Sequence, residues 1–349
     1  VTATGNSGTG NAVNGIVLSG AGVNADLTLH PSQGIDYVVS SIFINSGQTL
    51  TIDPGTVLKF LNTSSNLTCN GTLSAQGTPA STIYFTSVKD DTVGGDADGV
   101  IATPAAGNWA KVHISGSAAS AALEHCVKRY GGNDRGQLWL SSKAQATAAN
   151  CTIASSISDG VYCDTGVPNI TNTQVSYCAE SGLYFEGVSG VTVSGCTVNN
   201  NREGLYLNNC SSVAVSGNSF SGNEKGAVMS YITSLTLTNN SFSSNTVSAT
   251  EFLGNLSGTI TATGNTATGN GVNGLYFNNG NVSGSLTLQP SQGMDYVVKT
   301  LSVGSGQTLT INPGAVLKFP DIHSYLNCQG TLIAQGASAS PIYFTGLKD

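Results

Sequence analysis

The residues best suited to chemistry are four aspartates in the segment KDDTVGGDADG, namely Asp90, Asp91, Asp96 and Asp98. Carboxylates are preferred ligands of hard cations such as Ca²⁺, and the intervening glycines allow backbone carbonyls to converge on the same ion. The spacing differs from that of an EF-hand loop, and an acidic loop can equally be a solvated one. We therefore expect either a Ca²⁺ site or a solvated acidic loop here.

Three tyrosines recur at intervals of 22 residues, at Tyr162, Tyr184 and Tyr206. In a groove, such rings would stack on the faces of sugars, and the acids that follow would accept hydrogen bonds from sugar hydroxyls. On a strand face, the same rings would contact one another and stabilise the sheet. Val228 replaces the tyrosine at the next interval, which favours a structural ladder over a glycan-binding stripe.

Candidate catalytic groups are sparse. A glycoside hydrolase needs two facing carboxylates, and a polysaccharide lyase needs a base beside an acidic cluster. On the regular repeats, the candidates are Asp164 with Glu186, and Glu180 with Arg202 and Glu203. We expect no catalytic residues, with Asp164 and Glu186 as the alternative.

A short internal repeat supplies the elements that would position these residues. VTVSGCTVNNNREGLYLNNCSS from Val191 aligns without a gap with VAVSGNSFSGNEKGAVMSYITS from Val213, at an offset of 22 residues. Alternating segments with such a period, separated by Gly, Asn and Ser, are typical of a β-solenoid in which each repeat forms one coil. Strand alternation predicts that Val193 and Val198 point inward and Thr192 outward.

One position of each repeat is predicted to form an interior ladder. Its members are Cys126, Cys151, Thr173, Cys196, Asn218, Asn240 and Asn265. They are 22 to 25 residues apart, which fits one coil each. Polar side chains are tolerated inside because neighbours in the coils above and below supply hydrogen-bond partners.

The chain has eight cysteines, but no CxxC or Cys/His spacing that would indicate a zinc site. Interior positions suit a free, buried cysteine that acts as a small hydrophobe. Cysteines of adjacent coils could still form a disulfide, and the alignment favours Cys126 with Cys151 most.

A second, longer repeat divides the chain. Residues 1–90 recur as residues 260–349 without insertion or deletion, at an offset of 259 and with about three fifths of the positions identical. We expect solenoid coils in residues 1–90, an acidic, Gly-rich loop outside the stack at 91–108, regular coils at 109–259, and a second copy of the first segment at 260–349. The two copies indicate tandem duplication of a whole module.

The composition excludes several classes of protein. Charged residues make up 9% of the chain, far below the roughly 25% of an ordinary soluble domain. A net charge of −7 with only 12 lysines and arginines disfavours nucleic acid and anionic membrane surfaces as partners. The sequence contains no run of 18 apolar residues that would predict a membrane span. No segment has the apolar spacing of a helix.

Several segments resemble a known group of proteins. SGQTLTIDPGTVLKF, GTLSAQGTPASTIYFTSVKDD, GNWAKVHI and LEHCVKRYGG are similar to segments of large secreted bacterial β-helix repeat proteins in the pectin-lyase-like superfamily. The resemblance implies an all-β, right-handed parallel β-helix with coils of about 22–25 residues, located outside the bacterial cell or on its surface. It leaves activity open, because related proteins include lyases, hydrolases, adhesins and phage fibres.

The duplication decides between the functional hypotheses. Stalks, adhesins and filaments gain reach and avidity from repetition, so we expect a non-catalytic structural or adhesive module. Its expected partners are other copies of itself, end to end, because open solenoid ends expose unpaired strand edges. Glycans or cell-surface polymers are the other expected partners. The first alternative is a polysaccharide lyase or glycoside hydrolase that uses the β-helix groove.

Ice binding is the second alternative. It rests on outward pairs of hydroxyl residues such as Thr192 with Ser194 and Thr236 with Thr238. Serine and threonine are also ordinary residues of exposed strands, and Ala214 interrupts the column.

Overall fold

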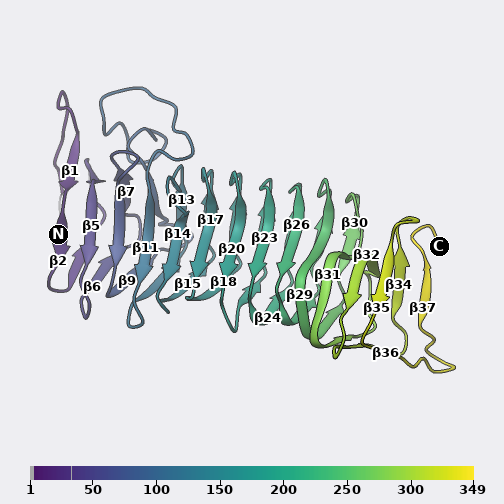
Figure 1. The fold of residues 1–349 in the computed structure, drawn as a ribbon. Coiled ribbons are helices and arrows are strands. Elements are labelled where there is room, and N and C mark those ends of the chain that lie inside the picture. Colours follow the sequence, from purple (N-terminus) through teal and green to yellow (C-terminus); the bar gives the residue numbers. More distant parts are fainter. Residues whose placement is uncertain (1–3, 33) are drawn as a thin grey trace. The chain divides into compact units, whose positions relative to one another are not determined.

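The computed structural model describes residues 4–32 and 34–349, so the first three residues of the predicted 1–90 segment, and Gln33, lie outside the described residues. All regular structure in the described ranges is β, in 37 strands (Figure 1). The described part of the chain contains no helix long and apolar enough to cross a bilayer. The predicted all-β solenoid is confirmed.

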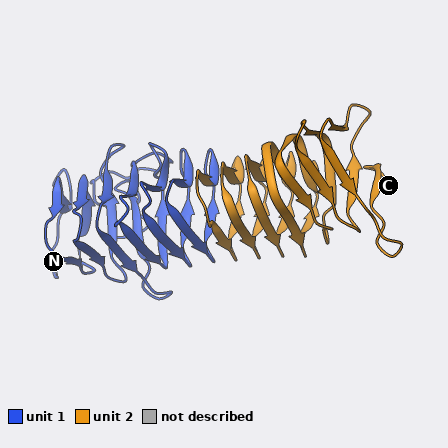
Figure 2. Ribbon diagram, turned by 60° about the horizontal axis from the view of Figure 1, so that its bottom comes forward, with its two compact units in different colours: residues 1–183 blue, residues 184–349 orange. Residues whose placement is uncertain are grey.

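The strands belong to two compact units, residues 1–183 and 184–349, which are coloured separately in Figure 2. In both units, successive strands along a face pair in parallel, as the coils of a solenoid require. The strand β20 (Ser181–Glu186) spans the boundary in the sequence.

Unit 1 has three strand faces. The first face contains β1 (Gly15–Leu18), β4 (Asp36–Val39), β7 (Val57–Phe60), β10 (Ile83–Ser87), β13 (Cys126–Arg129), β16 (Thr152–Ala154) and β19 (Gln174–Ser176). The second contains β2 (Ala21–Val23), β5 (Ser41–Ile44), β8 (Asn66–Cys69), β11 (Lys111–Ser115), β14 (Gly136–Ser141) and β17 (Asp159–Asp164). The third contains β3 (Leu27–Leu29), β6 (Thr49–Ile52), β9 (Thr72–Gln76), β12 (Ser120–Glu124), β15 (Gln145–Ala149) and β18 (Val167–Thr171).

Unit 2 continues the same pattern with some longer strands. Its first face contains β22 (Thr197–Asn199), β25 (Ser219–Ser221), β28 (Ser241–Ser243) and β30 (Thr266–Thr268). The other faces contain β21 (Thr192–Ser194), β23 (Glu203–Asn208), β24 (Ser211–Ser216), β26 (Lys225–Ser230), β27 (Thr233–Thr238), β29 (Ser248–Thr263) and β31 (Leu275–Leu288). The last strands are β32 (Tyr296–Val303), β33 (Thr308–Ile311), β34 (Val316–Phe319), β35 (Tyr325–Cys328), β36 (Thr331–Ala334) and β37 (Tyr343–Gly346).

Alternation along each strand fills the interior as predicted. Val193 and Val198 are fully buried, whereas Thr192 is exposed. Aligned apolar side chains stack between coils, as in the pair Phe220 and Phe242, whose rings lie parallel with centroids 5.1 Å apart. The core is therefore a set of columns, each built from the same position of successive coils.

A left-handed residue precedes each predicted ladder position. In unit 1, the backbone φ is 51° at Asn150 and 47° at Asn172. In unit 2, φ is 64° at Gly217 and 55° at Asn239. Glycine and asparagine accept this conformation more readily than other residues, so it turns the chain at the corner between two faces.

The two copies of the long repeat fold into the same strands. Strand β6 corresponds to β33, β7 to β34 and β8 to β35, each at an offset of 259 residues. The copies differ in what covers them. Leu73 and Phe85 are fully buried, whereas their counterparts Leu332 and Phe344 are 40% and 48% exposed. Strands β12 and β13 pack on β9 and β10, but among the described residues no further strand packs on β36 and β37.

Candidate metal centre

The acidic segment leaves the stack between β10 and β11 (Figure 1). The structure corrects one part of the expectation, because the segment is not wholly detached from the coils. Ala97 is 2% exposed and packs against Val38 and Val88, and its carbonyl accepts a hydrogen bond from the Asn14 amide at 2.8 Å. These contacts hold the loop against the first face of unit 1.

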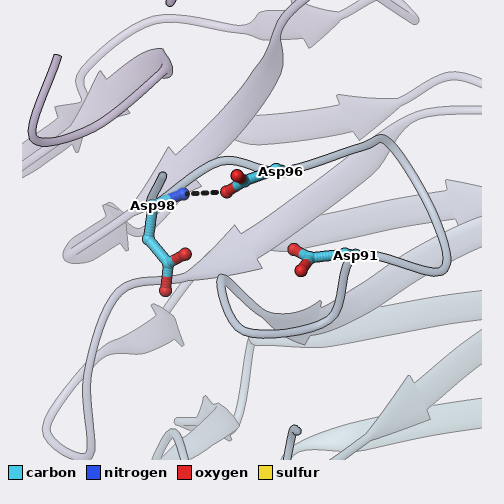
Figure 3. Close-up of side chains that lie close together, drawn as sticks. All are labelled: Asp91, Asp96 and Asp98. Atoms are coloured by element: carbon cyan, nitrogen blue, oxygen red, sulfur yellow. Dashed lines mark hydrogen bonds between the residues drawn. The ribbon is translucent and has the colours of Figure 1, made fainter. Parts of the chain in front are cut away.

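Three of the four predicted ligands lie together. Carboxylate oxygens of Asp91, Asp96 and Asp98 all lie within 4.8 Å of one another (Figure 3). The backbone amides of Asp98 and Gly99 donate to Asp96 Oδ1, at 3.2 and 2.6 Å. These bonds hold the Asp96 carboxylate in place.

Repulsion between the acids raises the energy of the cluster. Burial, and then the neighbouring charge of Asp96, raise the pKa of Asp91, while Lys59 opposes the shift. The Oδ1 atom of Asp91 is buried and has no hydrogen-bond partner. A divalent cation would supply both the missing partner and the missing positive charge.

Asp90 does not join the cluster, which corrects its assignment as a ligand. Its carboxylate is buried and accepts hydrogen bonds from Thr86 Oγ1 at 2.5 Å, Thr92 Oγ1 at 2.7 Å and Arg129 Nε at 2.7 Å. Burial alone would raise the pKa of Asp90, but the two threonine hydroxyls and the Arg129 guanidinium lower it below its usual value. Asp90 therefore anchors the start of the loop to β13.

Two residues beneath the loop were not predicted. Lys59 of β7 is fully buried, and its Nζ donates to the carbonyls of Asp90, at 3.1 Å, and of Gly95. The same Nζ lies 3.5 Å from Asp36 Oδ2. Burial raises the pKa of Asp36 to about 6, although Lys59 acts in the opposite direction.

The loop passes so close to Asp36 that it needs a glycine there. Gly94 has a φ of 70°, and a Cβ at this position would lie 2.0 Å from Asp36 Oδ2. The retention of Asp36 and Lys59 in the second copy, as Asp295 and Lys318, is the sequence signal that could have identified this pair.

Several members of the predicted interior ladder form hydrogen bonds between coils. In unit 2, the side-chain nitrogen Nδ2 of Asn218 donates to Asn240 Oδ1, and Asn240 Nδ2 donates to Asn265 Oδ1, both at 2.9 Å. The backbone amide of Cys196 donates to Asn218 Oδ1 at 2.8 Å. In unit 1, the backbone amide of Cys151 donates to Thr173 Oγ1 at 3.3 Å, and Cys126 Sγ donates to the Ala75 carbonyl at 3.2 Å.

A second asparagine ladder was missed. It consists of Asn201, Asn223, Asn245 and Asn270, joined by side-chain hydrogen bonds of 2.7 to 3.1 Å. The members are separated by 22, 22 and 25 residues, the same intervals as in the first ladder, so the signal was present in the sequence.

The tyrosines are not arranged as open platforms for sugars. The rings of Tyr184 and Tyr206 stack on each other, with centroids 5.1 Å apart and planes 11° apart. Tyr162 is 6% exposed, and its hydroxyl accepts a hydrogen bond from Arg135 at 2.7 Å. Each stacked ring covers a face that a sugar would need, which favours the structural interpretation.

The alternative catalytic residues lie at strand ends. Asp164 ends β17 in unit 1, and Glu186 ends β20 in unit 2. Glu186 Oε1 accepts a hydrogen bond from Asn208 at 3.1 Å, and Arg202 Nε donates to Glu203 at 3.0 Å. The first contact joins side chains of adjacent coils, and the second joins neighbours in the sequence.

Comparison with known proteins supports the fold. Residues 137–287 match the family model of the right-handed β-helix region. No curated protein matches the chain. A crystal structure of the TibC-catalysed, hyper-glycosylated fragment of TibA is similar at 13% identity and a TM-score of 0.27, over 94% of this chain and 99% of that one.

A crystal structure of the Dettilon tailspike protein is similar at 14% identity and a TM-score of 0.22. The alignment includes 95% of this chain and 62% of the tailspike chain, so the chain spans less than two thirds of the tailspike. The family match identifies residues 137–287 as a right-handed β-helix region.

Proposed function

We propose that the chain is a non-catalytic structural or adhesive module of a large extracellular protein on a bacterial surface or in a filament. The proposal rests on two repeats, the coil of about 22 residues and the long segment that recurs at an offset of 259 residues. Coils stack through matched apolar columns and asparagine ladders, and the duplicated segments form the same strands at an offset of 259 residues. Repetition of this kind lengthens a protein, whereas an enzyme needs a single site.

Mechanical unfolding tests the structural role. A chain held by stacked coils should unravel coil by coil under force, and a coil of 22 residues should release about 80 Å of contour length. Single-molecule force spectroscopy would measure these increments. Release of a whole unit in one step, without increments near one coil, would contradict a stack of individually held coils.

Incubation with polysaccharides tests the absence of catalysis. We expect no new reducing ends and no unsaturated products from a panel of bacterial and plant glycans, with or without Ca²⁺. Turnover that Asp164→Ala or Glu186→Ala abolishes would overturn the proposal in favour of a hydrolase or lyase.

End-to-end association with other copies is the proposed partnership. Its support is the exposed apolar edge of β36 and β37, which includes Leu332, Ile333 and Phe344. An open strand edge with apolar side chains is a template for pairing. Sedimentation velocity should show a mass that rises with concentration, and Ile333→Lys should suppress the rise. A constant monomer mass up to high concentration would contradict this part of the proposal.

Ca²⁺ is the proposed ligand of Asp91, Asp96 and Asp98. We expect binding in the range of extracellular Ca²⁺ modules, about 10⁻⁴ to 10⁻³ M. Titration calorimetry of the intact chain would detect it, and the triple variant D91N/D96N/D98N should lose it. Asp134→Asn is the matched control, because Asp134 is an exposed acid in a neighbouring loop whose partner is Lys111. Equal binding by the triple variant would place the ion elsewhere.

A further inference from the structure

Two cysteines that the proposed function does not use lie side by side inside unit 1. Cys126 begins β13, and Cys151 immediately precedes β16. The register pairs Val127 with Thr152, which sets Cys126 directly opposite Cys151. The two residues are 1% and 5% exposed, so both side chains face the interior. Paired strands are about 4.8 Å apart, which lies within the Cα separation of about 4.4 to 6.8 Å found in disulfides.

The thiols of Cys126 and Cys151 donate to the backbone carbonyls of Ala75 and Ala149, at 3.2 and 3.1 Å. The neighbouring sulfur is the largest influence on each thiol, and it lowers the pKa of Cys151 and raises that of Cys126. The pair is therefore asymmetric, with one sulfur prepared to act as a nucleophile.

A buried lysine supplies the charge that favours this thiolate. Lys128 lies two residues after Cys126 on the same inward side of β13 and is 1% exposed. Its Nζ has no hydrogen-bond partner and lies 3.8 Å from the centre of the Phe85 ring. Burial lowers the pKa of Lys128 to about 8, and the two cysteines oppose this change. The Lys128 ammonium therefore interacts electrostatically with both cysteines.

Other cysteines of unit 1 face apolar partners in the adjacent coil. Cys69 is opposite Ile114, and Cys163 is opposite Leu140. A thiol in these positions has an aliphatic neighbour in that coil. They are natural controls for the chemistry of the Cys126 and Cys151 pair.

We propose that Cys126 and Cys151 form a reversible disulfide that fastens β13 to β16, with Lys128 as the positioning residue that stabilises the attacking thiolate. The oxidant is a low-molecular-weight disulfide. The Cys151 thiolate attacks one sulfur of the oxidant, forms a mixed disulfide and releases a small thiolate. That thiolate takes the proton of Cys126, and the Cys126 sulfur then attacks Cys151 and expels the second small thiolate. Two protein thiols are oxidised, and one small disulfide is reduced to two thiols.

Counting thiols after refolding tests the disulfide. The intact chain is unfolded, reduced, and refolded in a buffer of reduced and oxidised glutathione, so that burial does not limit access. Titration in denaturant should fall from eight free thiols to six, and a non-reducing peptide map should contain one cross-linked pair, Cys126 with Cys151. Eight free thiols, or a cross-link between other cysteines, would overturn the proposal.

Two variants make the assignment specific. Cys151→Ser should keep all seven of its remaining thiols after refolding, whereas Cys163→Ser should fall from seven to five. Circular dichroism would establish that both variants are folded. If Cys151→Ser also lost two thiols, the bridge would involve other residues.

The role of Lys128 has its own measurement. Lys128→Met preserves the length of the side chain and removes the unpartnered ammonium, so we expect a folded protein that forms the same disulfide. During refolding in the same glutathione buffer, the Cys126–Cys151 bond should form at least about tenfold more slowly than in the parent chain, because the thiolate loses its charged neighbour. An unchanged rate would exclude Lys128 from the reaction.

Discussion

The same lysine and aspartate pair occurs in both copies of the long repeat, in two different environments. Lys59 pairs with Asp36 at 3.5 Å and donates to the Asp90 carbonyl, and Lys318 pairs with Asp295 at 3.2 Å. The Lys59 side chain is fully buried under the acidic loop, whereas that of Lys318 is 20% exposed. The coils thus bring the lysine and the aspartate together in both copies, and in the first copy the acidic loop covers the pair.

The first pair should affect the free energy of unfolding more than the second, because it is buried. An exposed ion pair contributes about 0 to 1 kcal/mol, because water and salt screen it. Removal of one partner of a buried pair leaves an uncompensated charge and costs about 3 to 5 kcal/mol. The two copies therefore allow one interaction to be measured with and without its cover.

The largest expected effect is that of removing each lysine. Lys59→Met should lower the local free energy of unfolding around β4 and β7 by about 3 to 5 kcal/mol, because the buried Asp36 carboxylate would lose its partner. Lys318→Met should change the corresponding value around β32 and β34 by less than about 1 kcal/mol. Hydrogen exchange measured by mass spectrometry resolves both regions in one molecule.

A second variant separates charge from packing in this test. Lys59→Met combined with Asp36→Leu removes both charges and should recover most of the loss, because a buried pair can be replaced by apolar groups at little cost. Equal losses in Lys59→Met and Lys318→Met would show that the loop does not isolate the first pair from water.

The next effect in size is the pH dependence that Asp36 gives to the first copy. The folded pKa of Asp36, about 6, is above its ordinary value of 3.8, so protonated Asp36 favours the folded state. Its contribution to stability is complete below pH 3.8 and is lost as the pH rises through about 6. The difference between a pKa of about 6 and the ordinary 3.8 corresponds to about 2 to 3 kcal/mol.

Asp36→Asn should remove this dependence, and Asp295→Asn should leave it unchanged. The measurement is hydrogen exchange of β4 between pH 4 and 7, corrected for the intrinsic exchange rate. Asp90 acts in the opposite sense, because its folded pKa is lowered, and its contribution is lost as the pH falls below 3.8. A slope that persists in Asp36→Asn would assign the pH dependence to another group.

The regular coils could be predicted from the sequence because their contacts repeat. Val193 and Val198 follow from strand alternation and a 22-residue period, and Asn218 follows from alignment of successive coils. Each such residue contacts the same position one coil away, so local pattern and long-range contact carry the same information. The second asparagine ladder obeys the same rule and could have been derived from it.

The loop and its supports could not be predicted in this way. Asp90 was assigned to the metal cluster, but its partner Arg129 lies 39 residues later, on the next strand of the face. Lys59 donates to the Gly95 carbonyl because the loop folds back over β7. The periodic pattern of the coils does not predict the course of this loop. Contacts made by an aperiodic segment depend on its turns, of which only the glycines are visible in the sequence.

The smallest of the three effects is that of adding a methyl group to the loop. Gly94→Ala should destabilise the covered site by about 1 to 3 kcal/mol, because residues other than glycine are strained at a φ of 70° and the new Cβ would strike Asp36. Gly95→Ala is the matched control, since Gly95 has a φ of 83° but nothing within 4 Å of an added Cβ. The control therefore reports backbone strain alone.

The difference between the two alanine variants measures how tightly the loop covers the pair. If contact with Asp36 matters, Gly94→Ala should also speed hydrogen exchange in β4 and β7, whereas Gly95→Ala should affect the loop only. Displacement of the loop would let water reach Asp36, so its pKa should fall toward the ordinary 3.8. If both variants gave the same exchange in β4, the strain of the turn would account for the whole effect, and the loop would not be what buries Asp36.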